Sequence, residues 1–445
     1  MQAITNSGYP RNLSFLSKKL HGSSRNNFRI SSLNATVASS SQIVSVDLPS
    51  NSLVDLSTLC MFFTGSTTST GGFSCFSRNI ESVIERIEVE INGNIVSTGC
   101  SFLNHLYQIL YDTQCGSDAK NRRSILQNGA DGVIPSADVK DVQYCIQTFP
   151  GFIDSLSPGV LDTSLVGNCR MRITLANSQC LISTAANTSA NYTLSNIFFS
   201  VDVISIDDGM FRQIHDKFLS SGGVYEYHFN NYLSFTSTGS SLSQSVKFSL
   251  STQSLNRLWG TFVPGQRYAI KTINGVDGGN HFFDPVSKSS SYFTRIGGGT
   301  DGSIITWGSG AGTAVTYTMN NWQFNCNGTY SPNWTPSAEQ AFGLLMANYG
   351  MDSSTGEGCT PALNSMGAWL SSMWCSSARF DHGTDGTSLI AGMNTLGNQS
   401  GGYWSCQGQI SGAGAGAPST IMGLVFAQIT SSLTVGAGRQ CVLVL

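Results

Sequence analysis

Charged side chains are scarce in this chain of 445 residues, because Asp, Glu, Lys and Arg together make up only 11% of it. An average globular protein carries about 25%. The formal net charge is -3, so the molecule as a whole lacks the basic character of a nucleic-acid-binding protein. A soluble protein that stands alone normally exposes more charge. The scarcity therefore indicates that partner molecules cover a large part of the surface.

Long apolar runs are also missing. No stretch approaches the roughly 18 apolar residues that cross a bilayer as a helix, and residues 1–7 lack the apolar centre of a secretory signal. The twelve Cys include no CxxC pair. Without a secretory signal, we expect most of them to be reduced thiols that pack as small apolar groups.

Catalytic and metal-binding patterns are absent as well. The six His form no HxH pair and no pair at i and i+4, no GxSxG motif occurs, and GGGTDGS lacks the Lys of a phosphate-binding loop. Two groups have the composition of a metal corner: Asp381, His382 and Asp385, and Asp277, His281 and Asp284. Both lie in Gly-rich segments, where such residues commonly serve turn geometry. The sequence therefore predicts no catalytic, cofactor-binding or metal-binding residue, and a protein that is not an enzyme.

Acidic residues are absent from the first 46 positions, although this stretch contains several cations. We interpret residues 1–40 as a basic N-terminal arm with the cations Arg11, Lys18, Lys19, Arg25 and Arg29. Such a segment is either a solvated tail or an arm that becomes ordered against a polyanion, an anionic lipid surface or a neighbouring subunit. Its apolar residues favour a protein or membrane contact: Phe15, Leu16, Leu20, Phe28 and Ile30.

What the sequence does contain is strand patterns in two halves. The run 191–206 is rich in β-branched and aromatic residues and predicts a long strand. Residues 208–223 follow with apolar side chains at helical spacing and end in Gly222-Gly223, which predicts a short linker helix. A strand pattern resumes at Val224. We therefore expect one β-rich domain over residues 41–207 and a second over 224–445.

Local signals define several elements inside these halves. Residues 86–91 alternate between polar and apolar, as a half-buried strand does, and Asn92-Gly93 then predicts a β-hairpin. Apolar residues at helical spacing predict helices over 101–113 and 337–350, each with a Ser at its start. We expect these two helices to be equivalent elements of two similar domains.

A weak internal repeat in the sequence supports the same expectation. The residues Ser82, Arg86 and Ile87 match Ser254, Arg257 and Leu258 with an offset of one position. The second half also has long Gly-rich loops around 297–313 and 383–402, and loops of this length are usually functional or interfacial. We expect these loops to form an outward face. All seven Trp lie in the second half, where they suit either a sugar site or, more commonly, core and interface anchors.

The order of these elements resembles that of double-jelly-roll major capsid proteins of tailless icosahedral viruses. It is most similar to the type found in virophages and Polinton-like viruses. The similarity covers about residues 40–445. It rests on the order and spacing of the segments ESVIERIEVEINGNIV, FLNHLYQILYD, NYTLSNIFFSVDVISID, YEYHFNNYLSF, VKFSLSTQSLNRLWGTF, WQFNCNGTYSP and VFAQITSSLTVGAGRQCVLVL.

The resemblance implies an all-β fold of two tandem eight-stranded jelly-roll β-sandwiches with a few short helices and long loops. It also implies pseudo-hexameric homotrimers that tile an icosahedral shell, with neighbouring capsomers, penton proteins and minor capsid proteins as partners. The protein is then expected in the virion, assembled inside the host cell. Its basic arm would face the interior, where an inner membrane or the genome lies.

The alternative is a lectin-like β-sandwich that binds carbohydrate or calcium through its Trp residues and its Asp/Gly loops. The missing secretory signal and the basic arm weigh against this reading.

Overall fold

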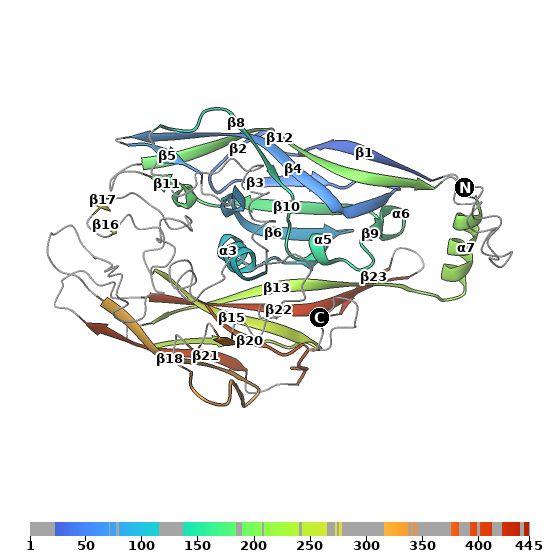
Figure 1. The fold of residues 1–445 in the computed structure, drawn as a ribbon. Helices are drawn as coiled ribbons and strands as arrows, with labels where there is room; N and C mark the ends of the chain where they lie inside the picture. The colour runs from blue at the N-terminus through green and yellow to red at the C-terminus, as the bar shows by residue number, and fades with distance from the viewer. Residues whose placement is uncertain are drawn as a thin grey trace, which may run out of the picture.

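The computed structural model describes residues 23–70, 72–76, 80–114, 137–183, 189–206, 209–239, 243–264, 272–273, 276–277, 316–336, 340, 343–344, 375–381, 392–397, 401–411, 421–436 and 440–444. Within these residues the chain forms four larger β-sheets stacked as layers (Figure 1), which we name A to D in the order of the stack, and two separate two-stranded pairs. Sheets A and B belong to the first half of the chain, and sheets C and D belong to the second half.

Sheets A and B form the first sandwich. Sheet A contains, in spatial order, β1 (Ser23–Ser31), β12 (Ser189–Ile206), β4 (Leu53–Thr70) and β8 (Val142–Ile146), with β2 (Val37–Ser39) on β12 and β9 (Val160–Asp162) on β4. Sheet B contains β3 (Ile43–Asp47), β10 (Cys169–Leu175), β6 (Ile84–Ile91) and β7 (Asn94–Ser97). A separate short pair joins β5 (Ser74–Cys75) to β11 (Ile182–Ser183).

Sheets C and D form the second sandwich. Sheet C contains β13 (Tyr225–Gly239), β22 (Ile421–Val435), β15 (Leu255–Pro264) and β20 (Ser376–Arg379), with β23 (Cys441–Val444) on β22. Sheet D contains β14 (Ser243–Phe248), β21 (Gly402–Ser411), β18 (Thr316–Cys326) and β19 (Thr329–Ser331). A further short pair joins β16 (Thr272–Ile273) to β17 (Val276–Asp277).

The two sandwiches have the same topology. Without the added strands β2, β9 and β23 and the short pairs, each sandwich has eight strands, and in chain order these form one sheet of strands 1-8-3-6 and one of strands 2-7-4-5. Two packed antiparallel sheets with this Greek-key order make a jelly roll. The expected fold of two tandem jelly rolls is therefore confirmed.

The helices are short. The helices with described bounds are η2 (Ile80–Val83), α3 (Leu103–Gln114), α5 (Phe152–Ser155), α6 (Thr163–Val166), η3 (Ser178–Cys180) and α7 (Gly209–Ser220). The helix predicted over 101–113 is α3, and the linker predicted over 208–223 contains α7. No helix among these residues is long and apolar enough to cross a membrane. The helix predicted over 337–350 lies mostly outside the described residues, although residues 340 and 343–344 are helical.

The hairpin predicted at Asn92-Gly93 joins β6 to β7. Both turn residues have positive φ, +50° for Asn92 and +81° for Gly93, as the tight turn between two antiparallel strands requires. By contrast, the internal repeat that was inferred from Ser82, Arg86 and Ile87 is wrong. The segment around Ser82–Ile87 leads into β6, the fourth strand of its jelly roll, whereas the segment around Ser254–Leu258 lies in β15, the third strand of the other.

The N-terminal boundary of the first jelly roll lies before residue 41 in the structure. Nine residues of β1 pair with β12, and β2 pairs with β12 as well, so residues 23–31 and 37–39 are part of sheet A. The segment SSRNNFRIS has no regular apolar alternation. It is a strand because the edge of β12 offers backbone hydrogen-bonding partners, which side-chain patterning does not reveal.

The two jelly rolls pack against each other through sheets B and C, with α3 and α5 between these layers (Figure 1). Phe152 of α5 meets Phe229 of β13 with ring centroids 5.0 Å apart. Ser157 and His228 exchange two backbone hydrogen bonds of 2.8 and 3.0 Å. The buried apolar residues of both halves form one continuous cluster, so the two jelly rolls are joined by a shared core.

Candidate assembly surfaces

The predicted cations divide into two groups. Arg25 and Arg29 lie in β1, while Arg11, Lys18 and Lys19 lie outside the described residues. Among the strands that the structure describes, β1 is the end strand of sheet A and pairs with β12 alone. Its residues 24–29 are all exposed. A strand with one open edge presents unpaired backbone groups to a partner, and charged side chains are a common protection against unwanted pairing.

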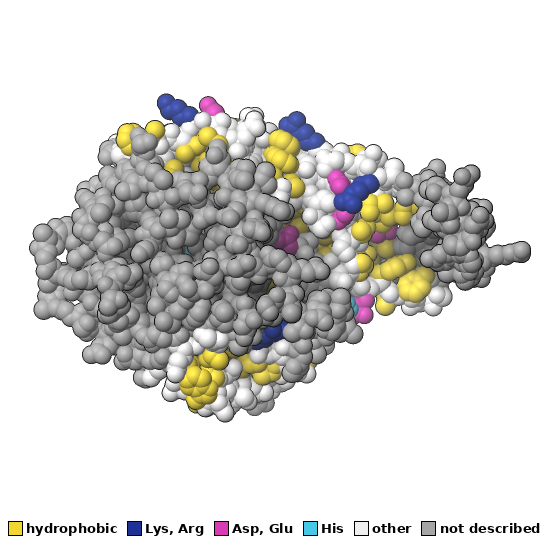
Figure 2. All heavy atoms as spheres, viewed as in Figure 1, with side chains coloured by type: hydrophobic (Ala, Val, Ile, Leu, Met, Phe, Trp, Pro, Cys, Tyr) yellow, Lys and Arg dark blue, Asp and Glu magenta, His cyan; other side chains and the backbone are white. Residues whose placement is uncertain are grey.

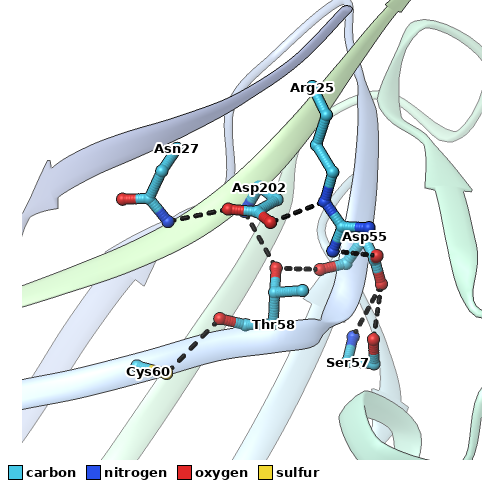
Figure 3. Close-up of polar contacts among 7 residues, drawn as sticks. All are labelled: Arg25, Asn27, Asp55, Ser57, Thr58, Cys60 and Asp202. Atoms are coloured by element: carbon cyan, nitrogen blue, oxygen red, sulfur yellow. Dashed lines mark hydrogen bonds and ion pairs between the residues drawn. The ribbon is translucent and has the colours of Figure 1, made fainter.

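Arg25 is held by two carboxylates of its own sheet (Figure 3). Its Nε donates to Asp202 Oδ2 at 2.6 Å, and its Nη2 donates to Asp55 Oδ2 at 2.8 Å. Asn27 Nδ2 donates to the other oxygen of Asp202 at 2.8 Å. These hydrogen bonds from Asn27 and Arg25 lower the pKa of Asp202 below its ordinary value. The charge of Arg25 is therefore compensated within sheet A.

Arg29 has an aromatic partner instead. Its guanidinium carbon lies 4.1 Å from the centre of the Phe198 ring, close enough for a cation–π contact. Phe198 in turn stacks on Phe62 of β4, with ring centroids 5.1 Å apart and ring planes at 12°. These residues lie on the outer face of sheet A, away from sheet B.

This outer face is more apolar than a solvated sheet face needs to be. Strand β4 buries every second residue along most of its length, and the alternate residues Cys60 and Phe62 are partly buried. Cys145 of β8 pairs directly with Phe62 and is also partly buried. The uninterrupted apolar run from Leu59 to Phe63 is the sequence signal for a strand that is covered on both faces.

In sheet C, both faces of the central strand are fully covered. Every residue of β22 from 423 to 429 is buried, because sheet D covers one face of sheet C and the first jelly roll covers the other. Strand β12 holds the equivalent place in sheet A, and its outward residues Phe198, Ser200 and Asp202 are only partly buried. The outer face of sheet A therefore corresponds to the face of sheet C that the first jelly roll covers, but no sheet of this chain covers it among the described residues.

Sheet D has the other outer face of the stack. Tyr330 and Tyr403 lie side by side there, with their hydroxyl oxygens 3.1 Å apart, and Tyr330 is 47% exposed. Ser245 and Lys247 of β14 are exposed on the same sheet. Figure 2 shows hydrophobic side chains among the polar ones at both ends of the stack, over sheet A and over sheet D.

The described residues offer little to the alternative functions. No group of three or more His, Cys, Asp or Glu among them could hold a metal ion. Of the two suggested metal corners, only Asp277 and Asp381 are described, and Asp381 forms ion pairs with Arg257 and Arg379.

The described Trp residues mostly serve the core. Trp259, Trp322 and Trp404 are at most 1% exposed, as the anchor interpretation predicts, whereas Trp334 is 46% exposed. The other three Trp lie outside the described residues. The ten described Cys form no disulfide, and seven of them are buried.

The fold was compared with known proteins. Neither a protein-family model nor a curated protein matches the sequence. The structure is similar to the capsid of the virus PBCV-1, at 12% sequence identity and a TM-score of 0.60, over 95% of this chain and 97% of that chain. PBCV-1 VP54, fitted into a reconstruction of the virophage Sputnik, gives 12% identity and a TM-score of 0.61 over the same shares of the two chains.

A third similar structure is the Faustovirus major capsid protein, at 8% identity and a TM-score of 0.55, over 93% of this chain and 91% of that chain. At such low identity the likeness concerns the fold alone, but it extends over nearly the whole of each chain. The chain therefore has the double-jelly-roll fold of viral major capsid proteins.

Proposed function

We propose that this protein is a major capsid protein, a structural subunit of a virus shell without catalytic activity. The observation that carries the proposal is the shared topology of two jelly rolls stacked side by side through sheets B and C. Two similar units in one chain give an oligomer many similar walls, so identical oligomers can tile a lattice. The capsid proteins with the same fold over more than nine-tenths of this chain support this reading.

The arrangement of the layers supports a homotrimer. Within one chain, sheet B of one jelly roll meets sheet C of the other. Sheet C has the strand order of sheet A, and sheet D has the strand order of sheet B. Repeating the same contact between chains therefore places sheet D of one chain on the outer face of sheet A of the next. Three chains would close such a ring with six jelly rolls, and closure would cover the partly buried row at Phe62 and Phe198.

Trimers arranged in this way need further partners to make a closed shell. Neighbouring trimers would fill a hexagonal lattice, and separate penton proteins would close it at the fivefold vertices of an icosahedron. Minor capsid proteins would join the trimers from below. The N-terminal arm would face the interior and contact adjacent capsomers, an inner membrane or the genome. The protein would then occur in the virion, after assembly inside the host cell.

Electron microscopy and light scattering of the purified protein test the proposal. We expect trimers with a hexagonal outline and, under assembly conditions, closed shells. The trimer interface should bury far more than the ~1,600 Å² of a standard contact. A stable monomer at micromolar concentration would contradict the proposal.

A substitution tests the role of sheet A in the trimer. Phe62→Asp places a charge in the proposed D-to-A contact, and we expect folded monomers in place of trimers. Ser221→Asp is the matched control, because Ser221 is exposed after α7 and lies on neither outer face. Trimers of normal stability with Phe62→Asp would show that this face is not the interface.

A further inference from the structure

An open groove of about 490 Å³ lies at the end of the first jelly roll where α7 begins. Its floor includes three residues that are neighbours across three strands, since Leu53 of β4 pairs with both Asp162 of β9 and Ile204 of β12. Ile206, the last residue of β12, and Asp216 of α7 complete the walls. The groove therefore combines apolar residues, among them Leu53 and Ile204, with two carboxylates and with the polar side chains of Asn and Ser.

The charge of the groove is negative. Asp216 is exposed, and Asp162 is 9% exposed, with Oδ1 accepting a hydrogen bond of 2.9 Å from the Ser164 backbone. Among the described residues that line the groove there is no Lys or Arg. A peptide with apolar and basic residues would complement such a surface.

The chain supplies a peptide of that kind at the same place. Ser23, the first residue of β1, pairs with Ile206 at the edge of the groove. The six residues 15–20 have the sequence FLSKKL, which combines three apolar residues with Lys18 and Lys19. Lys19 is four residues before Ser23, a distance of at most ~14 Å in extended chain. The two lysines are therefore within reach of the groove that lies beside their own first strand.

We propose that this groove is the docking site of the chain's own residues 15–20. Lys18 and Lys19 face Asp216, while Phe15, Leu16 and Leu20 contact the apolar residues of the lining. The segment of the same copy has the advantage over that of a neighbour, because its short connection to Ser23 gives it a high effective concentration. The docking restrains the inner part of the arm and leaves residues 1–14, with Arg11, beyond the groove. The inference does not depend on the role in a capsid.

Zero-length coupling tests the contact in the full-length protein. A carbodiimide joins a Lys to a carboxylate only when the two touch, and peptide mass spectrometry identifies the pair. We expect Lys18 or Lys19 to be joined to Asp216, with less coupling at 1 M salt, where the Debye length falls to about 3 Å. Absence of these pairs at low salt, or equal coupling to Glu226 of β13, which does not line the groove, would overturn the proposal.

A mixed-copy experiment identifies the occupant. Copies with Lys18→Gln and Lys19→Gln are combined with copies that have Asp216→Asn, and mixed assemblies are purified through two different tags. Neither copy can couple these groups within itself. We expect no such coupling in the mixed assemblies. Coupling there would show that the groove takes the arm of a neighbouring copy and would overturn the assignment to the same chain.

Proteolysis provides an independent readout. In Asp216→Lys, trypsin should cleave after Lys18 and Lys19 about two- to fivefold faster than in the unchanged protein, in line with the loss of an exposed ion pair. Glu226→Lys makes the same change of charge on β13, outside the groove, and should leave the rate unchanged. Equal thermal unfolding of the two variants confirms that both are folded. Unchanged cleavage in Asp216→Lys would overturn the proposal.

Discussion

Arg25 of β1 donates a hydrogen bond of 2.6 Å to Asp202 of β12, a residue 177 positions further along the chain. The same guanidinium reaches Asp55 of β4 at 2.8 Å, so one side chain ties three neighbouring strands of sheet A together (Figure 3). Because β1 is exposed along residues 24–29, its attachment depends on backbone pairing and on these polar contacts more than on apolar burial. The strength of the attachment should therefore respond to pH.

The first prediction concerns β1 in acid. The folded-state pKa of Asp202 is lowered, so its stabilising contribution is present above the unfolded pKa of about 3.9 and is lost as pH falls through the folded value. Protection of β1 amides against hydrogen exchange should stay constant from pH 8 to pH 5 and fall below about pH 4. In Asn27→Ala the loss should begin at a higher pH. The central strand β10 is the internal control, and parallel loss in β1 and β10 would contradict the prediction.

The second prediction concerns Asp381 in the second jelly roll. Its side chain is 3% exposed and forms ion pairs with Arg257, at 3.3 Å, and Arg379. The two arginines lie directly opposite each other on β15 and β20. Asp381→Asn leaves two largely buried like charges without their anion, and chemical unfolding should show a loss of roughly 3–5 kcal/mol. Asp47→Asn removes a more exposed partner of Arg170 and should change the unfolding midpoint little.

The third prediction concerns the core between sheets C and D. A Cβ atom at Gly260 of β15 would lie 2.4 Å from the Trp404 ring, and Trp404 is completely buried. Gly260→Ala should therefore cost about 1–3 kcal/mol of folding free energy, measured by denaturant unfolding. A Cβ at Gly343 would have open space, so Gly343→Ala should cause no loss. Equal effects of the two substitutions would show that Trp404 moves aside freely.

The fourth prediction concerns the arm. Arg25 is bound to its own sheet, and Lys18 and Lys19 are proposed to dock in the groove. Of the cations that precede β1, Arg11 therefore remains for outside contacts, and it contributes about 1 kcal/mol near an anionic surface. Deleting residues 2–22 keeps β1 and should leave trimers intact while impairing shell assembly, as measured by electron microscopy and by dissociation in salt. Shells of normal size and salt resistance would identify the arm as a passive tail.

The fifth prediction concerns the Gly-rich loops around 297–313 and 383–402, most of which lie outside the described residues. If they form the outward face of assembled particles, limited proteolysis of intact particles should cut there first. Cleavage confined to residues 1–40 would indicate that the opposite end of the molecule faces outward.

The sequence by itself determined the local elements and the fold class. The alternation over residues 86–91 with Asn92-Gly93 predicted β6, the hairpin and β7, because side-chain periodicity and turn residues act over a few neighbouring positions. The helical spacing over 101–113 predicted α3 for the same reason. These patterns indicated two β-rich halves, and the resemblance of their order to that of double-jelly-roll capsid proteins implied two jelly rolls.

Only the tertiary structure decided which strands are neighbours and which residues meet. β1 lacks an apolar pattern and becomes a strand by pairing with β12. The internal repeat inferred from the sequence matched the third strand of one jelly roll with the fourth strand of the other. Arg25, counted in the sequence as a free cation of the arm, is bound to Asp55 and Asp202. Periodicity tells which face of a strand is buried, but backbone hydrogen bonds between distant segments choose the partner and the register. Long-range contacts of that kind leave no mark in local sequence.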